Sequence, residues 1–378
     1  MKWVEVIASR VIDWFSGKPT LHEVRLSPTY NCNLACLPCV SRGRPLFKPE
    51  DELSKETYLK IIKEAAELGV KRFDICGGGD PFMRKDTMEI MKEIKNHGIK
   101  GTVSTNGTLF TKDMIKQIVE MEWDEVRFSI NGPNNKIDDR IRGVKGTFRK
   151  SIEAIKTFNY FKRELNKNKP TINLMPILTS LNYNKVCEFV ELAHSLEADT
   201  ITLQPFMSEI LEDPRKVSEG KRRRISRKLE IKERQRKKLR FYMDEAVKLA
   251  EKYNLTNNFE FIGSDEVEKT TDELISSDVE NIDGNPLLSI PCYTPWWLID
   301  IDNNGKVGLC SCTRVREDIK EKSLKEIWLG EKFEGFRKML AGSQIPKECK
   351  TCCAISVRDN RKIRNNISKM LVKHDMEK

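Results

Sequence analysis

Between residues 23 and 206, short β-branched runs alternate with stretches of helical periodicity, and this alternation constrains the fold more than any other feature. Helical patterns lie near 54–68, 85–97, 112–121, 147–164 and 184–196. Six strands are expected, at 23–29, 72–76, 101–105, 125–130, 172–178 and 200–206. Such alternation predicts a parallel sheet with right-handed crossovers. Six strands favour a partial (β/α)6 TIM-like barrel of the α/β class over a closed eight-stranded barrel.

The cysteines gather in two groups. Cys32, Cys36 and Cys39 follow the first predicted strand, and the last quarter of the chain holds Cys292, Cys310, Cys312, Cys349, Cys352 and Cys353. The odd total of 11, and an N-terminal stretch interrupted by acidic residues and unlike a secretory signal, argue against a disulfide framework. Clustered cysteines in a reducing compartment usually bind metal. The first group fits an iron–sulfur cubane with one open iron, or a zinc site that borrows a distant cysteine.

The net charge of +10 comes from one segment of the chain. Residues 215–240 hold 14 Lys+Arg and 3 Asp+Glu, a balance of +11, so the rest of the chain carries −1. This basic segment follows the sixth predicted strand and leads into a helical pattern at 244–253. Connections that leave the carboxyl ends of barrel strands line the active-site face. We therefore expect the segment to recruit an anionic partner, with a solvated helix face as the alternative.

A glycine motif follows the second predicted strand, in the sequence Cys76-Gly77-Gly78-Gly79-Asp80-Pro81. Glycines at a strand end let a ligand approach the backbone closely. One crossover after the Cys-x3-Cys-x2-Cys loop, this motif resembles that of the radical S-adenosylmethionine (radical SAM) enzyme superfamily. The sequence departs from the family pattern at Pro38, where an aromatic is common, at Asp80, where Glu is usual, and at Asn131, where Asp is frequent.

This resemblance implies a set of cofactor-binding residues. A [4Fe–4S] cluster would be held by Cys32, Cys36 and Cys39. The methionine ammonium of SAM would lie against the backbone of the glycine motif. Contacts to SAM are implied for Gly78, Gly79, Asp80, Pro81, Ser104, Asn106, Ser129, Asn131, Arg142 and Gln204.

The C-terminal cysteines lie in a pattern that resembles the SPASM/twitch modules, which hold auxiliary iron–sulfur clusters. Cys292 opens the pattern, a turn ending at Gly305 precedes Cys310, and Cys349 and Cys352 close it. Because no cysteine follows Cys353, the resemblance implies the shorter twitch type. Its one auxiliary [4Fe–4S] cluster would bind Cys292, Cys310, Cys349 and Cys352. Packing is the expected role of Cys76, Cys187, Cys312 and Cys353.

Four consecutive parts are expected along the chain. They are an N-terminal amphipathic helix (1–21), a radical SAM core (22–255) with the basic insertion 215–240, a linker (256–287) and a twitch/SPASM domain (288–378). The N-terminal helix gathers Trp3, Val4, Ile7, Val11, Trp14 and Phe15 on roughly one face. We expect this face to pack on the barrel, with an interfacial membrane helix as the alternative.

The resemblance implies reductive cleavage of SAM to a 5′-deoxyadenosyl radical, which abstracts hydrogen from an unactivated C–H bond. An auxiliary cluster favours an oxidative outcome, dehydrogenation or bond formation, on a bulky anionic substrate such as a peptide. Ferredoxin or flavodoxin is the expected reductant. One alternative is the same chemistry on a polar membrane lipid, and another is a non-catalytic zinc protein that binds nucleic acid, a partner not otherwise expected. The expected location is the cytoplasm, with peripheral contact at the inner face of the membrane as an option.

Overall fold

The computed structural model describes residues 3–39, 51–206, 228–264, 285–310, 313–346, 349 and 354–376. The chain divides into two compact units, each assembled from separated segments. The first unit comprises Met1–Leu26, Leu53–Asp74 and Glu268–Lys378, and the second comprises Ser27–Glu52 and Ile75–Val267. The four consecutive parts expected from the sequence stay a prediction.

The second unit is built on parallel strands. In spatial order they are β3 (Lys100–Thr105), β4 (Glu125–Phe128), β5 (Thr171–Leu174), β7 (Thr200–Ile201) and β9 (Thr256–Asn257). The register places Thr105 opposite Phe128 and Phe128 opposite Leu174. Because neighbouring strands run in the same direction, their carboxyl ends share one edge of the sheet. The parallel pairing expected from the alternation is confirmed.

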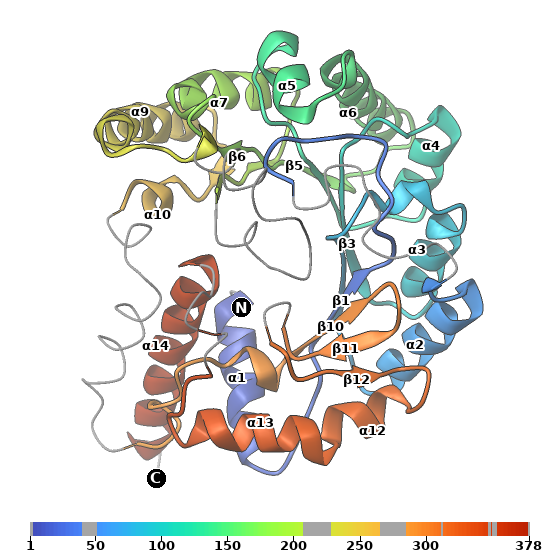
Figure 1. The fold of residues 1–378 in the computed structure, drawn as a ribbon, viewed down its shortest axis with the longest axis vertical. Coiled ribbons are helices and arrows are strands. Elements are labelled where there is room, and N and C mark those ends of the chain that lie inside the picture. The colour runs from blue at the N-terminus through green and yellow to red at the C-terminus, as the bar shows by residue number, and fades with distance from the viewer. Residues whose placement is uncertain are drawn as a thin grey trace. The chain divides into compact units, whose positions relative to one another are not determined.

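Helices of the second unit flank these strands (Figure 1). They are η2 (Pro81–Met83), α3 (Thr87–Asn96), α4 (Lys112–Glu120), α5 (Asn135–Arg142), α6 (Thr147–Glu164), η3 (Tyr183–Lys185), α7 (Val186–Ser195), α9 (Glu233–Lys252) and α10 (Phe259–Gly263). Side chains at the helix starts define several of these bounds. The Thr111 hydroxyl accepts a hydrogen bond from the Met114 amide at the start of α4, and Asn134 caps α5 through the Ile137 amide. The helix α5 has no counterpart in the sequence prediction.

The last two predicted strands are each interrupted. The run at 172–178 gives β5 and then β6 (Ile177–Leu178), and the run at 200–206 gives β7 and then β8 (Gln204–Pro205). The strands β6 and β8 form their own parallel pair, in which the Gln204 amide donates to the Pro176 carbonyl over 2.9 Å. Proline lacks the N–H that a central ladder needs, so the first run breaks at Pro176. The second run breaks earlier than its proline, at residues 202–203, and Pro205 lies within β8 opposite Leu178.

Part of the basic segment belongs to a helix that starts earlier than the expected 244. The helix α9 begins at Glu233 and buries Leu239, Met243, Ala246 and Ala250. It packs against η3, α7 and α10. Residues 215–227 of the segment lie outside the described residues.

The first unit combines strands from both ends of the chain. Their spatial order is β12 (Glu317–Asp318), β11 (Lys306–Gly308), β10 (Leu298–Asp302), β1 (Glu23–Ser27) and β2 (Arg72–Ile75). The strands β10, β11 and β12 pair antiparallel. Its helices are α1 (Trp3–Phe15), α2 (Lys55–Glu67), η6 (Thr294–Trp296), α12 (Leu324–Leu329), α13 (Glu331–Ala341) and α14 (Ala354–Met376). The carboxylate of Glu64 on α2 accepts the Leu324 amide at the start of α12 over 2.6 Å.

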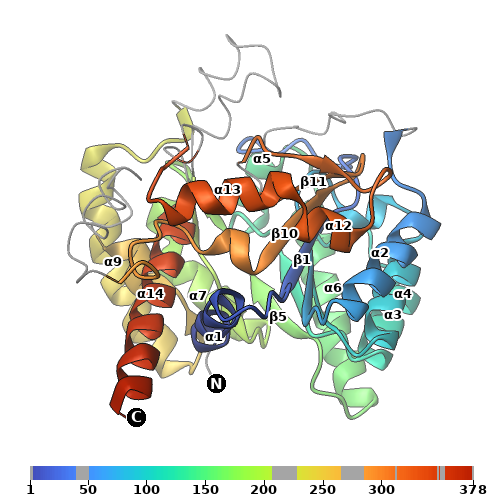
Figure 2. The same ribbon diagram turned by 90° about the horizontal axis from the view of Figure 1, so that it is seen from below.

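The N-terminal helix is covered by C-terminal elements of its own unit. The helices α1 and α14 lie side by side (Figure 2). Trp3 meets Trp297 edge-on with ring centroids 5.5 Å apart, and Phe15 stacks on Trp296 at 5.8 Å. These contacts occupy most of the apolar face of α1, with Phe15 still 45% exposed, and they leave the interfacial membrane alternative without support. No helix among the described residues combines the length and apolarity needed to cross a bilayer.

A buried arginine fixes the same helix. The Arg337 guanidinium of α13 lies 4.2 Å from the ring centroid of Trp14 and 4.2 Å from that of Trp328. Its side chain is 2% exposed, and its Nε donates to the Pro295 carbonyl over 2.8 Å. A desolvated cation between two indole faces is a favourable arrangement, so Arg337 ties α1 to α12 and η6.

Candidate active site

The loop that carries the first three cysteines rests on the carboxyl end of α5. The Leu37 amide donates to the Ile141 carbonyl over 2.8 Å, and the Ala35 amide donates to the Arg142 carbonyl over 3.3 Å. A Cβ on Gly143, whose φ is +77°, would lie 2.6 Å from the Ala35 carbonyl oxygen. A glycine therefore ends α5 where the cysteine loop comes closest.

The glycine motif pairs with the backbone that leads into this loop. The Gly79 amide donates to the Thr29 carbonyl and the Asp80 amide to the Asn31 carbonyl, each over 2.8 Å. A Cβ on Gly79 would lie 1.9 Å from the Asn31 carbonyl oxygen, and one on Gly78, whose φ is +64°, 2.6 Å from the Thr29 oxygen. Both positions thus require glycine, and the two motifs identified in the sequence form one layer of backbone.

The Asp80 side chain points into the protein. Its carboxylate accepts hydrogen bonds from the Phe82 amide at 3.0 Å, the Thr105 hydroxyl at 2.9 Å and the Asn106 amide at 2.7 Å. Burial raises the pKa of this carboxyl, and these hydrogen bonds partly offset the rise. Asp80 therefore joins the glycine motif to the end of β3. Its predicted contact with SAM, like that of Pro81, stays a prediction.

Asn106, at the end of β3, contacts a cluster cysteine directly. Its carboxamide oxygen accepts the Thr108 amide at 2.8 Å and the Thr108 hydroxyl at 2.6 Å. This orientation turns its NH2 group toward the Asn33 carboxamide oxygen at 2.8 Å and the Cys32 Sγ at 3.9 Å. The side chain of Asn106 therefore joins the end of β3 to Cys32 in the loop.

Arg142 is fully buried below the loop. Its guanidinium donates to Asp138 at 3.3 Å, to the Ser151 hydroxyl at 2.9 Å and to the Asn106 carbonyl. Its charge lowers the pKa of the Cys36 thiol, against a larger rise from burial. The structure thus shows Arg142 supporting Asn106, whereas its contact with SAM stays a prediction. Sequence reasoning missed Asp138 and Ser151, since helical spacing alone does not show that they face Arg142.

The other predicted SAM contacts lie at strand ends. Asn131 accepts the Ile177 amide on its carboxamide oxygen at 2.8 Å and is buried between β4 and β6. Ser104 in β3, Ser129 after β4 and Gln204 in β8 are half-buried. Among the described residues, the side chains of these three have no recorded hydrogen-bond partner. They remain predicted SAM contacts.

The donor set and backbone of this loop fit an iron–sulfur cluster. Burial raises the pKa of Cys32, and raises that of Cys36 to about 12, with further increases from the charge of Cys39. Thiols that share one electrostatic environment lie close together, and a bound metal favours their deprotonated forms. Three cysteines within eight residues, all on one loop, suit a cluster that is ligated by cysteine.

Three of the four predicted auxiliary ligands are described, and all belong to the first unit. Burial raises the pKa of Cys292 to about 11, and the charge of Cys310 raises it further, while hydrogen bonds from Thr294 and Asn360 lower it. Cys349 donates its amide to the Pro346 carbonyl. Cys352, Cys312 and Cys353 lie outside the described residues. Cys292 and Cys310 interact electrostatically, and thiols placed in this way suit a cluster ligated by cysteine.

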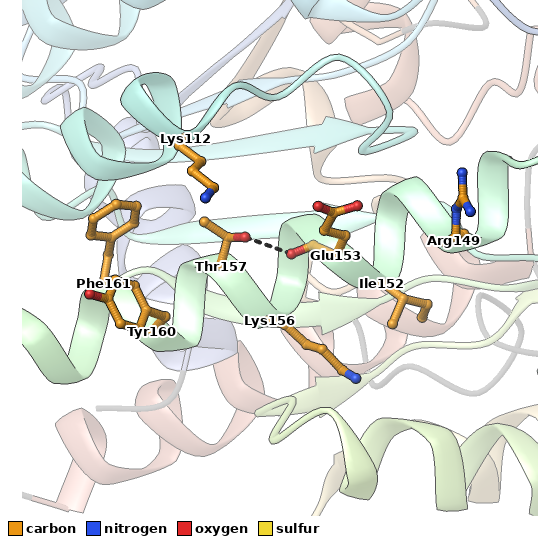
Figure 3. A pocket seen from close by; sticks show the side chains of 8 residues that line it. All are labelled: Lys112, Arg149, Ile152, Glu153, Lys156, Thr157, Tyr160 and Phe161. Atoms are coloured by element: carbon orange, nitrogen blue, oxygen red, sulfur yellow. Dashed lines mark hydrogen bonds between the residues drawn. The ribbon is translucent and has the colours of Figure 1, made fainter.

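A surface hollow of about 500 Å³ lies along α6, and Lys112 of α4 also lines it (Figure 3). It is lined by Lys112, Arg149, Ile152, Glu153, Lys156, Thr157, Tyr160 and Phe161. The Thr157 hydroxyl donates a hydrogen bond to the Glu153 carbonyl of the same helix, over 2.8 Å. None of the predicted site residues lines this hollow, so it is separate from the cysteine loop.

Comparison with known proteins yields two family matches. Residues 26–193 match the radical SAM superfamily, and residues 292–353 match the SPASM iron–sulfur cluster-binding domain. The chain is 25% identical over 351 residues to a tungsten-containing aldehyde ferredoxin oxidoreductase cofactor-modifying protein of Pyrococcus furiosus, covering 88% of this chain and 87% of that protein. It is 26% identical over 178 residues to PqqA peptide cyclase of Bradyrhizobium diazoefficiens, covering 47% of this chain and 44% of the cyclase.

Solved structures agree on the fold. SuiB of Streptococcus suis, in complex with its precursor peptide SuiA, superposes with a TM-score of 0.62 at 15% identity, covering 92% of this chain and 74% of SuiB. Most of the curated relatives are matched over less than two thirds of their length. The predicted α/β fold, a partial (β/α)6 barrel followed by a small cysteine-rich domain, is confirmed. With its cysteine loop and glycine motif inside the first match, the chain contains a radical SAM domain, followed by a SPASM iron–sulfur cluster-binding domain.

Proposed function

We propose that this protein is a radical SAM enzyme that oxidatively modifies a peptide. The pairing of the glycine motif with the arm of the cysteine loop carries this proposal, because it places a glycine cradle beside three clustered thiols. Two iron–sulfur family matches on one chain favour this function over a non-catalytic zinc protein.

The residues of the chain have distinct roles in this reaction. Cys32, Cys36 and Cys39 would ligate the cluster, and the backbone at Gly78 and Gly79 would receive the methionine part of SAM. When bound, the cluster and SAM supply the 5′-deoxyadenosyl radical that abstracts hydrogen from a substrate carbon. Asp80 and Arg142 hold the backbone of Asn106 from both sides and so fix the end of β3 beside the cysteine loop.

The half-buried cysteines of the first unit support an oxidative outcome. Cys292, Cys310 and Cys349, with Cys352 as the predicted fourth ligand, would hold an auxiliary cluster. Complete ligation by cysteine leaves no iron open to substrate, which suits electron transfer. Removing a hydrogen atom, one electron and a proton from the substrate would give dehydrogenation or a new bond, with the auxiliary cluster accepting the electron and a base or water accepting the proton. An external reductant such as ferredoxin or flavodoxin would supply the electron that starts each turnover.

Two observations support a peptide substrate with an acidic segment. One is that PqqA peptide cyclase and SuiB, which resemble this chain, are named with their peptides. The other is an outward stripe on α9, formed by Arg234, Lys237, Lys238 and Phe241. These residues follow the i, i+3, i+4, i+7 spacing of one helix face, and Phe241 is 64% exposed.

The cations of this α9 stripe differ from a lysine farther along the helix, which has an acidic partner. Farther along the helix, Lys248 pairs with Glu245 at 2.8 Å. Among the described residues, no ion pair is recorded for Arg234, Lys237 or Lys238. A fixed helix face with unpaired cations and an aromatic ring complements an acidic polypeptide segment. The lipid alternative has no such support once the apolar face of α1 is covered.

Anaerobic reconstitution with iron and sulfide tests the chemistry. The reduced protein should convert SAM to 5′-deoxyadenosine, measured by chromatography, and Cys36→Ala should not. The peptide hypothesis predicts a short open reading frame beside the gene, and its peptide should then lose two hydrogens or gain a cross-link, measured by mass spectrometry. Iron-loaded protein that never forms 5′-deoxyadenosine would refute the proposed reaction.

Binding measurements test the α9 stripe separately. A fluorescein-labelled oligo-glutamate peptide should bind at low salt, and Lys237→Glu with Lys238→Glu should weaken binding by about tenfold. The matched control reverses Lys112 and Lys116, two exposed lysines on α4. Equal weakening in both double variants, or tighter binding to anionic vesicles or to an oligonucleotide than to the peptide, would remove the support that the stripe gives to a peptide substrate.

A further inference from the structure

The sequence that carries the cluster cysteines is flanked by two residues whose side chains meet. The Thr29 hydroxyl donates to the Glu52 carboxylate over 2.6 Å. Thr29 is 1% exposed. The same hydroxyl oxygen accepts the Asn31 amide at 3.1 Å, and the Thr29 carbonyl accepts the Gly79 amide. Thr29 therefore holds the arm of the cysteine loop both to the glycine motif and to Glu52.

Arg84 completes this arrangement from the far end of the 3-10 helix η2. Its guanidinium donates to the second oxygen of Glu52 at 3.1 Å and to the Pro28 carbonyl at 3.4 Å. Two further bonds, at 2.9 and 2.7 Å, join it to both oxygens of Asp86. The side chains of Arg84 and Glu52 are each 11% exposed, so these charge-assisted bonds are largely shielded from water.

We propose that Arg84 and Glu52 form a clamp that holds the cysteine loop in its cluster-binding conformation. The clamp joins three separate parts of the chain, namely Pro28–Thr29 before the cysteines, Glu52 after them, and Arg84–Asp86 beyond the glycine motif. Fixing both ends of a loop lowers the entropy lost when its three thiols surround a cluster. Arg84 and Glu52 are thus positioning residues, since their side chains act on the loop through Thr29 and Pro28.

The fixed orientation of Arg84 gives the clamp its specificity. Asp86 takes one edge of the guanidinium in a bidentate pair, which leaves Nη1 directed at Glu52 and Pro28. A lysine can replace the charge but not this planar fork. The clamp should therefore be weakened by Arg84→Lys and lost in Arg84→Ala.

Iron retention tests the clamp without any substrate and without turnover, so it is independent of the proposed peptide chemistry. Reconstituted protein is mixed with a strong ferrous chelator under argon, and iron release is followed by absorbance. A Cys36→Ala variant identifies the phase that belongs to the auxiliary site. If the clamp contributes as much as one charge-assisted hydrogen bond, Arg84→Ala should accelerate release from the cysteine loop by about tenfold, and Arg84→Lys by less. The auxiliary phase should not change.

Arg127→Ala is the matched control, because Arg127 pairs with Glu125 at 3.1 Å with similar shielding, 16% and 21% exposed, and lies on β4. It should leave both phases unchanged. If Arg84→Ala does not fold, Thr29→Val replaces it, since this change removes the hydroxyl bond to Glu52 and keeps the shape; it should accelerate the same phase. Unchanged release from the loop, or equal acceleration of both phases in the clamp and control variants, would overturn the proposal.

Discussion

Replacing Gly79 with alanine tests whether the contact between the glycine motif and the cysteine loop controls SAM cleavage. The added Cβ would lie 1.9 Å from the Asn31 carbonyl oxygen, whereas real Cβ atoms essentially never come closer than 3.0 Å to such a neighbour. The two backbone segments must therefore separate by about 1.1 Å. Because the neighbour is main chain, no side-chain rotation relieves the clash.

This separation stretches two hydrogen bonds beyond their useful range, from Gly79 to Thr29 and from Asp80 to Asn31, each now 2.8 Å. At about 0.5–1.5 kcal/mol apiece, their loss costs about 1–3 kcal/mol locally. The larger effect is on the reaction, because Asn31 directly precedes Cys32. A displacement of about 1 Å between cluster and SAM should lower the rate of SAM cleavage by about 100-fold.

The assay is the initial rate of 5′-deoxyadenosine formation by reduced, reconstituted protein, with thermal unfolding measured in parallel. Gly335→Ala is the matched control, because a Cβ at this α13 position meets nothing within 4 Å. It should leave SAM cleavage unchanged and raise stability by about 0.5–1 kcal/mol, as alanine does inside a helix. A Gly79→Ala protein that loads iron and cleaves SAM at the wild-type rate would refute the reasoning.

Three further predictions concern other parts of the molecule. Burial raises the pKa of Asp124, but hydrogen bonds from Lys169, Lys95 and the Gly101 amide outweigh it, so the folded pKa lies below the unfolded value of about 3.9. The stability this carboxylate adds is fully present above about pH 4 and is lost as the pH falls through the folded pKa, so the difference in unfolding midpoint between wild type and Asp124→Asn should shrink on acidification. Arg337→Ala should destabilise the protein by about 2–4 kcal/mol in chemical denaturation, since it removes the cation between two indoles and leaves the Pro295 carbonyl unpaired; a loss below 0.5 kcal/mol, the scale of a surface substitution, would contradict this. Cys349→Ala should spare 5′-deoxyadenosine formation but stop peptide modification, and loss of SAM cleavage in that variant would show that the two cysteine groups do not act separately.

The strands that border the site could be predicted closely from the sequence, whereas two later ones could not. The runs at 101–105 and 125–130 became β3 and β4 with small changes of bounds. Their β-branched and aromatic residues are a local strand signal, and the apolar side chains among them, Val103, Val126 and Phe128, are fully buried. The run at 172–178 broke at Pro176, which cannot donate a ladder hydrogen bond, and the run at 200–206 broke at residues 202–203, where no residue type signals a break. The start of α9 was hidden because its exposed face is basic and its apolar positions are sparse.

The cysteine loop and the glycine motif were determined by the sequence itself. Ligand spacing within a short loop and glycines at a strand end are properties of adjacent residues, so they can be recognised without a fold. The tertiary structure decided where the long side chains point. Arg142 supports Asn106, Asp80 accepts hydrogen bonds at the end of β3, and Arg84 contacts Glu52. Each of these partners is distant in the sequence, so only the packing of the chain brings it close. Desolvation of these charged groups makes such partners obligatory, and no pattern in a single chain shows which partner will be close enough to satisfy them.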